Sequence, residues 1–253
     1  MVDALACGAA YQYLMSLEKR IMSWLFGNPI SRLRGWFGEK KVGLRLWLTL
    51  SSKIYRRYYD LIIPAKFGTS QIDHLLVSEY GLFIIETKNK QGWIFGSGGQ
   101  AQWTQVIYGK KFTFQNPLRQ AFSQKKSLAK FLKIPETKIH TIAYFSGRCK
   151  FKTKMPPNVL RRGLRSYIRS FRLPILSPAE VAQILANLNQ HIAQSTLTAK
   201  AHVKSLKQRH SSKTICPRCG AKLVKRIGPR RLLFRSRFLG CERFPKCRFT
   251  RKL

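Results

Sequence analysis

The sequence predicts a mixed α/β (α+β) fold, a sheet flanked by helices, followed by a small C-terminal domain. Three observations predict it. Short runs of β-branched and aromatic residues, separated by turns, alternate with longer segments of helical periodicity. The 253 residues are 44% hydrophobic, which is enough for the packed core of one ordinary domain and a small second one. Four of the six cysteines follow residue 215, in two closely spaced pairs.

The chain carries a strong positive charge. Lys and Arg number 48 against 10 acidic residues, which gives a formal charge of +38. Such a charge repels itself unless a polyanion is bound, so nucleic acid is the favoured partner and an anionic membrane surface is the alternative. The sequence lacks a long apolar run and a signal-peptide pattern. We therefore expect a cytoplasmic, nucleoid-associated protein without a transmembrane segment.

The N-terminal part of the sequence predicts two helices. Apolar pairs recur at helical spacing over residues 4–26, within an N-terminal helical segment of residues 1–33. We expect this stripe to pack on its own domain, and a membrane or another protein is the alternative. A second helix runs from about Gly38 to Leu50, with Glu39 in its first turn, where the helix dipole favours a carboxylate. The functional alternative is that Glu39 reaches a metal ion.

The stretch from Gln71 to Lys90 organises the rest of the chain. Two apolar runs, Ile72–Val77 and Leu82–Ile85, flank the turn sequence Ser-Glu-Tyr-Gly. Short β-branched and aromatic runs around a glycine-containing turn are typical of a β-hairpin. A loop of two or four residues pairs the last residue of the first run with the first residue of the second.

The same register brings two acidic side chains together. Asp73 falls opposite Glu86, and because side chains alternate along a strand, Gln71 and Lys88 share their face. Two carboxylates that face each other across a sheet repel. A divalent cation between them removes the repulsion, since hard cations bind carboxylate oxygens. The hairpin therefore predicts a metal site at Asp73 and Glu86.

Two further parts of the sheet are predicted on either side of this hairpin. Tyr58–Ile63 forms the first strand, which Pro64 stops. Asp60 lies in that strand and either orients its neighbours or is a buried structural carboxylate. Residues 103–114 predict a second hairpin around Gly109.

A helix follows the second hairpin. Asn116 and Pro117 are typical of a helix start, and the helix runs to about Lys133. Gln120 lies in its first turns, where it either hydrogen-bonds a metal-bound water or a phosphate, or is a plain surface glutamine. Ile139–Phe145 then predicts the last strand of this domain.

Residues 150–193 predict a basic helical extension. Arg161, Arg165 and Arg169 are spaced by four and therefore share one helical face. No acids balance them, which favours a phosphate-contacting face over a merely solvated one. The polar residues 194–213 that follow predict a linker.

The cysteines at the C-terminus predict a metal site. Cys216 and Cys219 form one short loop, and Cys241 and Cys247 form a second. Two such loops supply four thiolates to one tetrahedral Zn²⁺ ion per chain, which provides much of the folding energy of so small a domain. A chain that stays inside the cell also favours zinc over disulfides.

Basic and aromatic side chains surround these cysteines. They suit attraction to a nucleic-acid backbone together with base stacking, and a purely structural zinc clip is the alternative. The candidate nucleic-acid-binding residues of this domain are Arg235, Arg237, Phe238, Phe244 and Lys246.

An ordered series of motifs runs from about Arg34 to Phe145. Its members are Gly35-x-x-Gly38-Glu39, Asp60-Leu61-Ile62, Gly68-Thr69, Gln71-Ile72-Asp73-His74, Tyr80-Gly81-Leu82-Phe83, Glu86-Thr87-Lys88-Asn89, Gly92-Trp93-Ile94-x-Gly96, Trp103-x-Gln105 and Asn116-Pro117-Leu118-x-x-Gln120. In this series the chain resembles the nuclease-related domain (NERD) family, which is PD-(D/E)xK nuclease-like. The resemblance implies a restriction-endonuclease-like mixed sheet. It also implies that Asp73 and Glu86, helped by Glu39, hold a catalytic Mg²⁺ or Mn²⁺ while Lys88 stabilises the attacking hydroxide.

The C-terminal residues carry a second resemblance. Phe238-Leu239-Gly240-Cys241 and Phe244-Pro245-Lys246-Cys247 resemble the C4 zinc fingers at the C-terminus of bacterial type I topoisomerases. In that family the modules help to bind single-stranded DNA, although this chain is too short to hold the strand-passage body. The expected order is a helical segment (1–33), a nuclease-like domain (34–149), a basic extension (150–193), a linker (194–213) and a zinc finger (214–253).

These features leave three functions open. The favoured one is a metal-dependent nuclease that hydrolyses phosphodiester bonds in DNA gripped by the zinc finger. The alternative is a non-catalytic module that uses a nuclease-like fold to bind nucleic acid. A membrane-surface or scaffolding protein is the third. The intact set of Asp73, Glu86 and Lys88 favours the enzyme.

Overall fold

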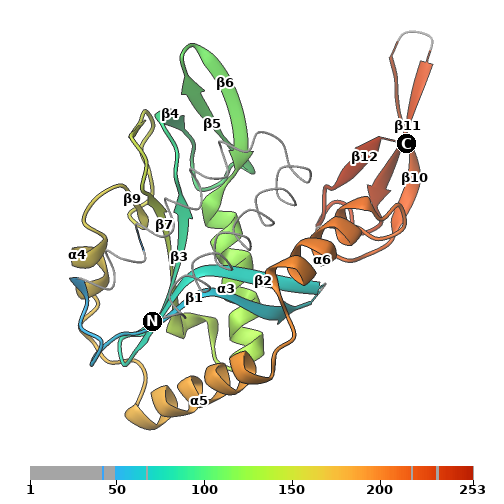
Figure 1. Ribbon diagram of the computed structural model, residues 1–253. Coiled ribbons are helices and arrows are strands. Elements are labelled where there is room, and N and C mark those ends of the chain that lie inside the picture. The colour runs from blue at the N-terminus through green and yellow to red at the C-terminus, as the bar shows by residue number, and fades with distance from the viewer. Residues whose placement is uncertain (1–41, 43–48, 67, 218, 232–233, 253) are drawn as a thin grey trace, which may run out of the picture. The chain divides into compact units, whose positions relative to one another are not determined.

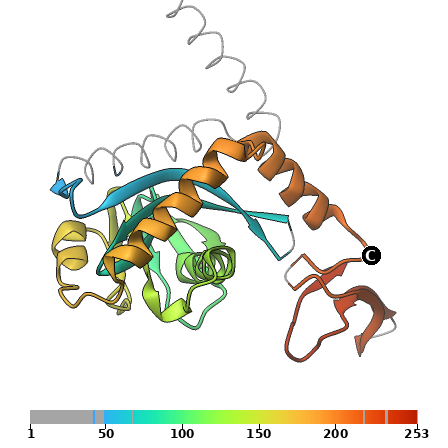
Figure 2. The ribbon, with the colours of Figure 1, turned by 90° about the horizontal axis from the view of Figure 1, so that it is seen from below.

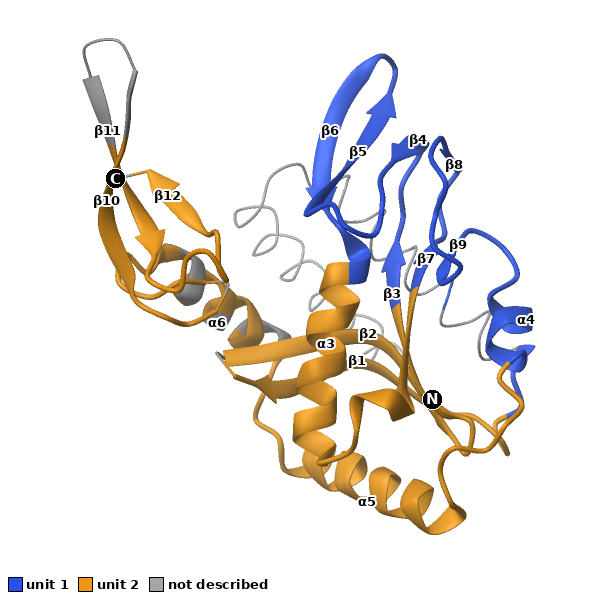
Figure 3. Cartoon of the chain, turned by 180° about the vertical axis from the view of Figure 1, so that it is seen from behind, with its two compact units in different colours: residues 1–51, 86–118, 143–170 blue, residues 52–85, 119–142, 171–253 orange. Residues whose placement is uncertain are grey.

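The computed structural model describes residues 42, 49–66, 68–217, 219–231 and 234–252 (Figure 1). The chain divides into two compact units, each made of three segments (Figure 3). Unit 1 comprises residues 1–51, 86–118 and 143–170, and unit 2 comprises residues 52–85, 119–142 and 171–253. Mixed sheets flanked by helices give the α+β fold that the sequence predicts. The helix predicted over residues 4–26 and most of the one predicted from Gly38 lie outside the described residues.

Unit 1 is built on a four-stranded sheet with the order β6-β5-β4-β8. Its strands are β4 (Gly92–Phe95), β5 (Gln102–Ile107), β6 (Lys110–Gln115) and β8 (Cys149–Phe151). The hairpin predicted around Gly109 is confirmed as β5 and β6. Tyr108 and Gly109 both have positive φ angles, 49° and 71°, as a two-residue type I′ turn requires.

One face of this sheet forms the core of unit 1. Ile94 and Trp103 are fully buried on it, and the Trp103 ring stacks on Phe145 with 6.0 Å between centroids. Trp103 Nε1 donates a hydrogen bond to the Ser97 carbonyl oxygen at 2.8 Å, so the buried indole is satisfied. Gly96 allows this packing, because a Cβ at its position would lie 2.4 Å from the indole ring.

The basic extension also contributes to the fold of unit 1. The end of β7 (Ile139–Phe145) pairs in parallel with β9 (Val159–Leu160), with Ala143 opposite Val159. Ile139–Phe145 is therefore a strand, as expected, but it is not the last one. Helix α4 (Leu164–Arg169) follows β9.

Unit 2 contains β1 (Arg56–Ala65), β2 (Gly68–Ser78) and the first residues of β3 (Gly81–Lys88), which hydrogen-bond in that order and then to β7. The expectation that Pro64 ends the first strand is wrong, since Pro64 lies inside β1 opposite Thr69. The reason is the position of β1 at the edge of the sheet, where the missing N–H of proline breaks no ladder bond.

Two helices cover the sheet of unit 2. Helix α3 (Pro117–Leu132) begins where predicted, and the Asn116 side-chain oxygen accepts a hydrogen bond from the Leu118 N–H at 2.9 Å. Helix α5 (Pro178–Gln194) begins with a capping box and runs across β1 and β2 (Figure 2). The apolar side chains that join helices to strands are Leu61, Ile63, Ile72, Leu75, Leu128, Ile184 and Leu188.

The remainder of unit 2 is helix α6 and a small cysteine-rich sheet. Residues 199–211, expected to be part of a linker, form α6 (Ala199–Ser211), and Thr198 caps its first turn. The Thr69 hydroxyl and His202 Nδ1 lie 2.7 Å apart and attach α6 to β2. The small sheet has the order β10 (Leu223–Arg231), β11 (Phe234–Cys241) and β12 (Thr250–Lys252).

Candidate functional site

The hairpin that the sequence places at the centre of the chain is present. Ser78 pairs with Gly81 and Val77 with Leu82, so the loop has two residues. Gly81 has a φ of 111°, and a Cβ there would lie 3.0 Å from the Lys138 carbonyl oxygen, so glycine suits this turn on both counts. The paired residues continue to His74 and Ile85, one step before Asp73 and Glu86. The facing of those two carboxylates stays a prediction.

In unit 2, Asp73 has a second acidic residue nearby. The pairs Tyr59–His74 and Leu61–Ile72 leave Asp60 and Asp73 at the intervening position of the β1–β2 ladder. Asp60 is exposed and is therefore not a buried structural carboxylate. Its φ of 51° is unusual for a residue other than glycine, and such strain often occurs at functional sites.

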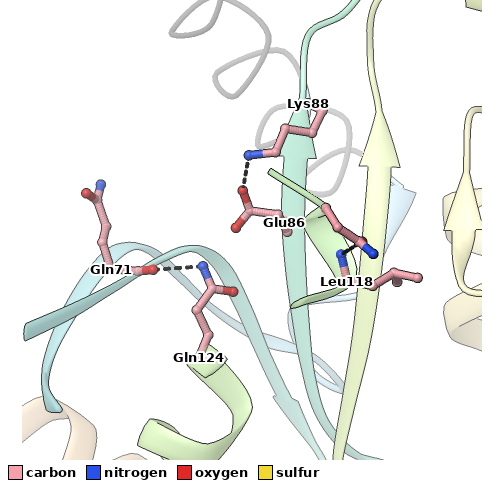
Figure 4. Close-up of polar contacts among 6 residues, drawn as sticks. Gln71, Glu86, Lys88, Leu118 and Gln124 are labelled. Atoms are coloured by element: carbon pink, nitrogen blue, oxygen red, sulfur yellow. Dashed lines mark hydrogen bonds and ion pairs between the residues drawn. The ribbon is translucent and has the colours of Figure 1, made fainter. Parts of the chain in front are cut away.

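Helix α3 holds the strand that carries Asp73. Gln124 is 3% exposed, and its Nε2 donates a hydrogen bond to the Gln71 carbonyl oxygen at 2.9 Å (Figure 4). The Gln71 side chain reaches back to Asp60 Oδ1 at the long distance of 3.5 Å. Gln120, the glutamine favoured by the sequence, is half-buried one turn earlier on α3. Gln124 was missed as a positioning residue because its bond spans 53 positions of the chain.

In unit 1, Glu86 and Lys88 form a pair on one face of β3. Glu86 is 1% exposed, and Lys88 Nζ lies 2.5 Å from its Oε1 (Figure 4). Alternation along a strand predicts that these two residues share a face, and the contact confirms it. Burial of a carboxylate requires a cation or hydrogen-bond donors nearby, and Lys88 supplies the cation.

Lys90 lies two residues after Lys88, just beyond the end of β3, and was missed from the sequence. Burial and then the charge of Lys88 lower the pKa of Lys90. Its ammonium lies 4.7 Å from the centroid of the Phe114 ring. The charges of Lys88 and Lys90 together create a positive field at this end of β3, which suits a phosphate anion.

The arrangement of the three arginines differs from the prediction. Helix α4 begins at Leu164, after Gly163 in a left-handed conformation, so Arg161 lies before the helix and does not share a helical face with Arg165 and Arg169. A glycine with a φ of 71° interrupts the helical path between them. Arg165 and Arg169 are both exposed.

The remaining predicted site residues are Glu39 and those of the zinc finger. Glu39 lies outside the described residues, as does the side chain of Arg235. Arg237, Phe244 and Lys246 are exposed on the small sheet and its second cysteine loop, and Phe238 is half-buried.

The four cysteines of unit 2 form a zinc-binding site. The sulfur atoms of Cys216, Cys219, Cys241 and Cys247 lie within 4.8 Å of one another, and the Cys216–Cys247 pair is 3.8 Å apart. Tetrahedral Zn–S bonds of about 2.3 Å place the sulfurs about 3.8 Å apart, so the cluster fits the ion.

The surroundings of the sulfurs favour a bound cation. Burial raises the pKa of the Cys241 thiol to about 12, so a thiolate there needs positive charge beside it. Backbone N–H groups of Ala221 and Arg243 hydrogen-bond the sulfurs of Cys219 and Cys241 and favour their thiolate forms.

A groove of about 400 Å³ lies beside the cysteines. Phe238, Phe244 and Phe249 line it together with Arg226. The Arg226 guanidinium lies 5.7 Å from the centroid of the Phe244 ring, and its Nη2 donates to the Cys241 carbonyl oxygen at 3.2 Å. Phe244 is 57% exposed, so part of this aromatic side chain, with the Arg226 cation beside it, is accessible to a ligand.

Comparison with known proteins agrees with both parts of this description. The model of the nuclease-related domain matches residues 34–146, and the topoisomerase DNA-binding C4 zinc finger matches residues 213–253. An uncharacterized protein of Bacillus anthracis is 32% identical over 187 residues, which is 72% of this chain and 84% of the relative. The chain belongs to the nuclease-related domain family. No solved structure matches it.

Membership of the nuclease-related domain family and the zinc finger support DNA binding and a nuclease-like fold. The family match ends at residue 146, whereas β8, β9 and α5 come from residues after it and belong to the same two units. None of the described helices has the length and apolarity that crossing a bilayer requires.

Proposed function

We propose that the chain is a metal-dependent nuclease that hydrolyses phosphodiester bonds in DNA. The observation that carries the proposal is the contact between Glu86, a buried carboxylate, and Lys88 on the same face of β3. Asp73 on β2 supplies the second carboxylate of the set. An aspartate, a glutamate and a lysine together provide metal ligands and a cation for the developing negative charge.

The available donors suit Mg²⁺ or Mn²⁺. Asp73 and Glu86 would hold the ion, with Glu39 as a further ligand, because hard divalent cations bind carboxylate oxygens. Asp60, beside Asp73 in the β1–β2 ladder, adds negative charge to this part of unit 2. When bound, the ion polarises the scissile phosphate and lowers the pKa of a water molecule.

Side chains of the protein perform the remaining tasks. The Lys88 ammonium stabilises the attacking hydroxide and the charge that builds on the phosphate in the transition state. Gln120 orients the water by a hydrogen bond. Gln124 holds the backbone of Gln71 through its 2.9 Å bond and so fixes the strand on which Asp73 lies.

The zinc finger and the basic surfaces hold the strand. We propose that a base of single-stranded DNA stacks on Phe244 in the groove beside the cysteines, with Arg226 next to it. The exposed side chains of Arg165 and Arg169 contact phosphates. Such a function places the protein on the nucleoid in the cytoplasm.

Cleavage of labelled single-stranded and duplex DNA with Mg²⁺, with Mn²⁺ or with EDTA tests the nuclease proposal. We expect cleavage that EDTA stops, and a loss of at least about a hundredfold in Glu86→Gln, since the variant removes a metal ligand. Glu79→Gln is the matched control, because Glu79 is an exposed carboxylate in the turn of the same hairpin. Equal cleavage by Glu86→Gln and its parent would show that the assigned site is wrong.

A non-catalytic DNA-binding module is the second candidate, and one observation favours it. Lys88 contacts Glu86 Oε1, one of the two oxygens that this carboxylate offers to a metal ion. If Lys88 keeps that oxygen when DNA is bound, no substrate is cleaved with either metal while DNA binding persists. The same assay distinguishes the two functions.

A further inference from the structure

The four-stranded sheet of unit 1 has an outer face that combines aromatic and basic side chains. Lys150 pairs with Trp93, Trp93 with Val106, and Val106 with Lys111. Directly paired residues lie on the same face of a sheet, so these four side chains form one row across β8, β4, β5 and β6. With strands about 4.8 Å apart, the row is about 14 Å wide.

A second row lies beside the first. Phe95 pairs with Thr104, and Thr104 with Thr113, each two positions from a member of the first row. Alternation places both rows on one face. Lys152 follows β8, and its ammonium lies 4.3 Å from the centroid of the Trp93 ring.

This face is not the one that forms the core of unit 1. Ile94 and Trp103, whose positions alternate with those of Trp93 and Thr104, are fully buried on the opposite side. Trp93 is 50% exposed, although tryptophan is highly buried on average in folded proteins. Lys111, Lys150 and Lys152 are exposed around it.

The charge of the unit is one-sided. Within the described part of unit 1, Glu86 is the one acidic residue, and it is buried against Lys88. Among the described residues of unit 1, no acidic side chain therefore lies beside the lysines at the edges of the outer face. A polyanion supplies the missing negative charge.

We propose that the outer face of the β6-β5-β4-β8 sheet is a docking surface for single-stranded nucleic acid. Lysines at both edges of the rows bind phosphates, and a base stacks on the exposed ring of Trp93. A duplex is a poorer occupant, because its bases are stacked on one another and offer no free ring face. The proposal goes beyond cleavage, since the surface binds a strand whether or not Glu86 and Lys88 act on it.

Charge reversal at two neighbouring positions tests the proposal in the full, zinc-loaded chain. Lys111 lies on the outer face, whereas Lys110, the next residue of β6, points to the other side, and both are exposed. We expect Lys111→Glu to weaken binding of fluorescent dT and rU oligonucleotides about tenfold at low salt, and Lys110→Glu by no more than about twofold. Equal losses overturn the proposal, because they show that total charge alone sets the affinity.

Loss of the aromatic ring and cross-linking test the stacking contact. Trp93→Ala should weaken single-strand binding about tenfold and duplex binding much less, since one stacking contact is lost. Thermal unfolding of each variant checks that the fold is intact.

In the parent, ultraviolet cross-linking to 5-iodouracil oligonucleotides should label the peptide that contains Trp93. Labelling confined to the zinc finger, or tighter binding of duplex than of single strands by this face, contradicts the proposal. Failure of these binding tests would leave the cleavage result for Glu86→Gln unaffected.

Discussion

At the scale of single residues, Glu86 is under two opposing influences. The first is repulsion from Asp73, which the sequence predicts. Repulsion alone would make the Glu86→Gln variant, in the absence of metal, as stable as its parent or more stable. The contact with Lys88 acts in the other direction, because the carboxylate is 1% exposed and the lysine is its counterion. The stability of variants shows which influence is larger.

We expect the ion pair to be larger. In zinc-loaded protein without added Mg²⁺ or Mn²⁺, Glu86→Gln should lower the free energy of unfolding by about 1–2 kcal/mol. This is less than the ~3–5 kcal/mol typical of a fully buried pair, because Lys88 is partly exposed. Urea unfolding measures it, and a double-mutant cycle with Lys88→Gln isolates the coupling between the two side chains. The control Glu79→Gln should change stability by less than about 0.5 kcal/mol. A Glu86→Gln variant at least as stable as its parent would contradict this expectation, because it would mean that the ion pair is no larger than the repulsion.

At the scale of elements, the small sheet depends on its metal. Its buried side chains are three of the cysteines together with Ala221, Leu223 and Leu239, so apolar burial alone is too small to stabilise it.

Cys216→Ser should therefore release zinc and unfold residues after about 213, since zinc binding supplies about 10–16 kcal/mol in such domains. Elemental analysis and amide hydrogen exchange measure the two effects. Cys149→Ala is the control, because Cys149 is a cysteine of unit 1 outside the zinc-binding site and its loss should leave the zinc content at one ion per chain. A zinc-free variant whose last forty or so residues keep their protection would contradict the idea that metal holds this domain together.

Elements with local signals could be predicted from the sequence. The β2–β3 hairpin follows from its apolar runs and Gly81, and helix α3 follows from the Asn116 cap. The four zinc ligands follow from cysteine spacing, and their sulfurs converge as expected.

Features that depend on distant partners could not be predicted. A proline usually ends a strand, but an edge strand tolerates it. Pro64 lies in such an edge strand, and the order of the strands in a sheet cannot be read from the sequence. Helix α6 is polar enough to resemble a linker, yet the bond between His202 and Thr69 attaches it to β2. The outer face around Trp93 requires pairing across four strands, which no local pattern reveals.

At the scale of the whole molecule, charge is the dominant property. Lys and Arg outnumber acidic residues by 48 to 10. Two of the acids, Glu86 and Glu180, already pair with lysines, and hydrogen bonding from Lys138 lowers the pKa of Glu180 to about 2. The excess positive charge is therefore not neutralised within the chain, and binding of a polyanion should release many counterions.

The affinity for single-stranded DNA should consequently fall steeply as salt rises. For a single strand the logarithm of the binding constant falls with the logarithm of salt concentration by about 0.7 for each phosphate neutralised. If Lys111 and Lys150 each neutralise one phosphate, the double variant Lys111→Gln/Lys150→Gln should reduce the slope by about 1.4 relative to the parent. Lys110→Gln, on the other side of β6, should leave the slope within about 0.3 of the parent value, because its side chain faces away from the docking surface. Fluorescence anisotropy titrations across a range of NaCl concentrations give these slopes. An affinity that is flat between low and physiological salt would argue against nucleic acid as the partner, because a chain with a formal charge of +38 must release counterions when it binds a polyanion.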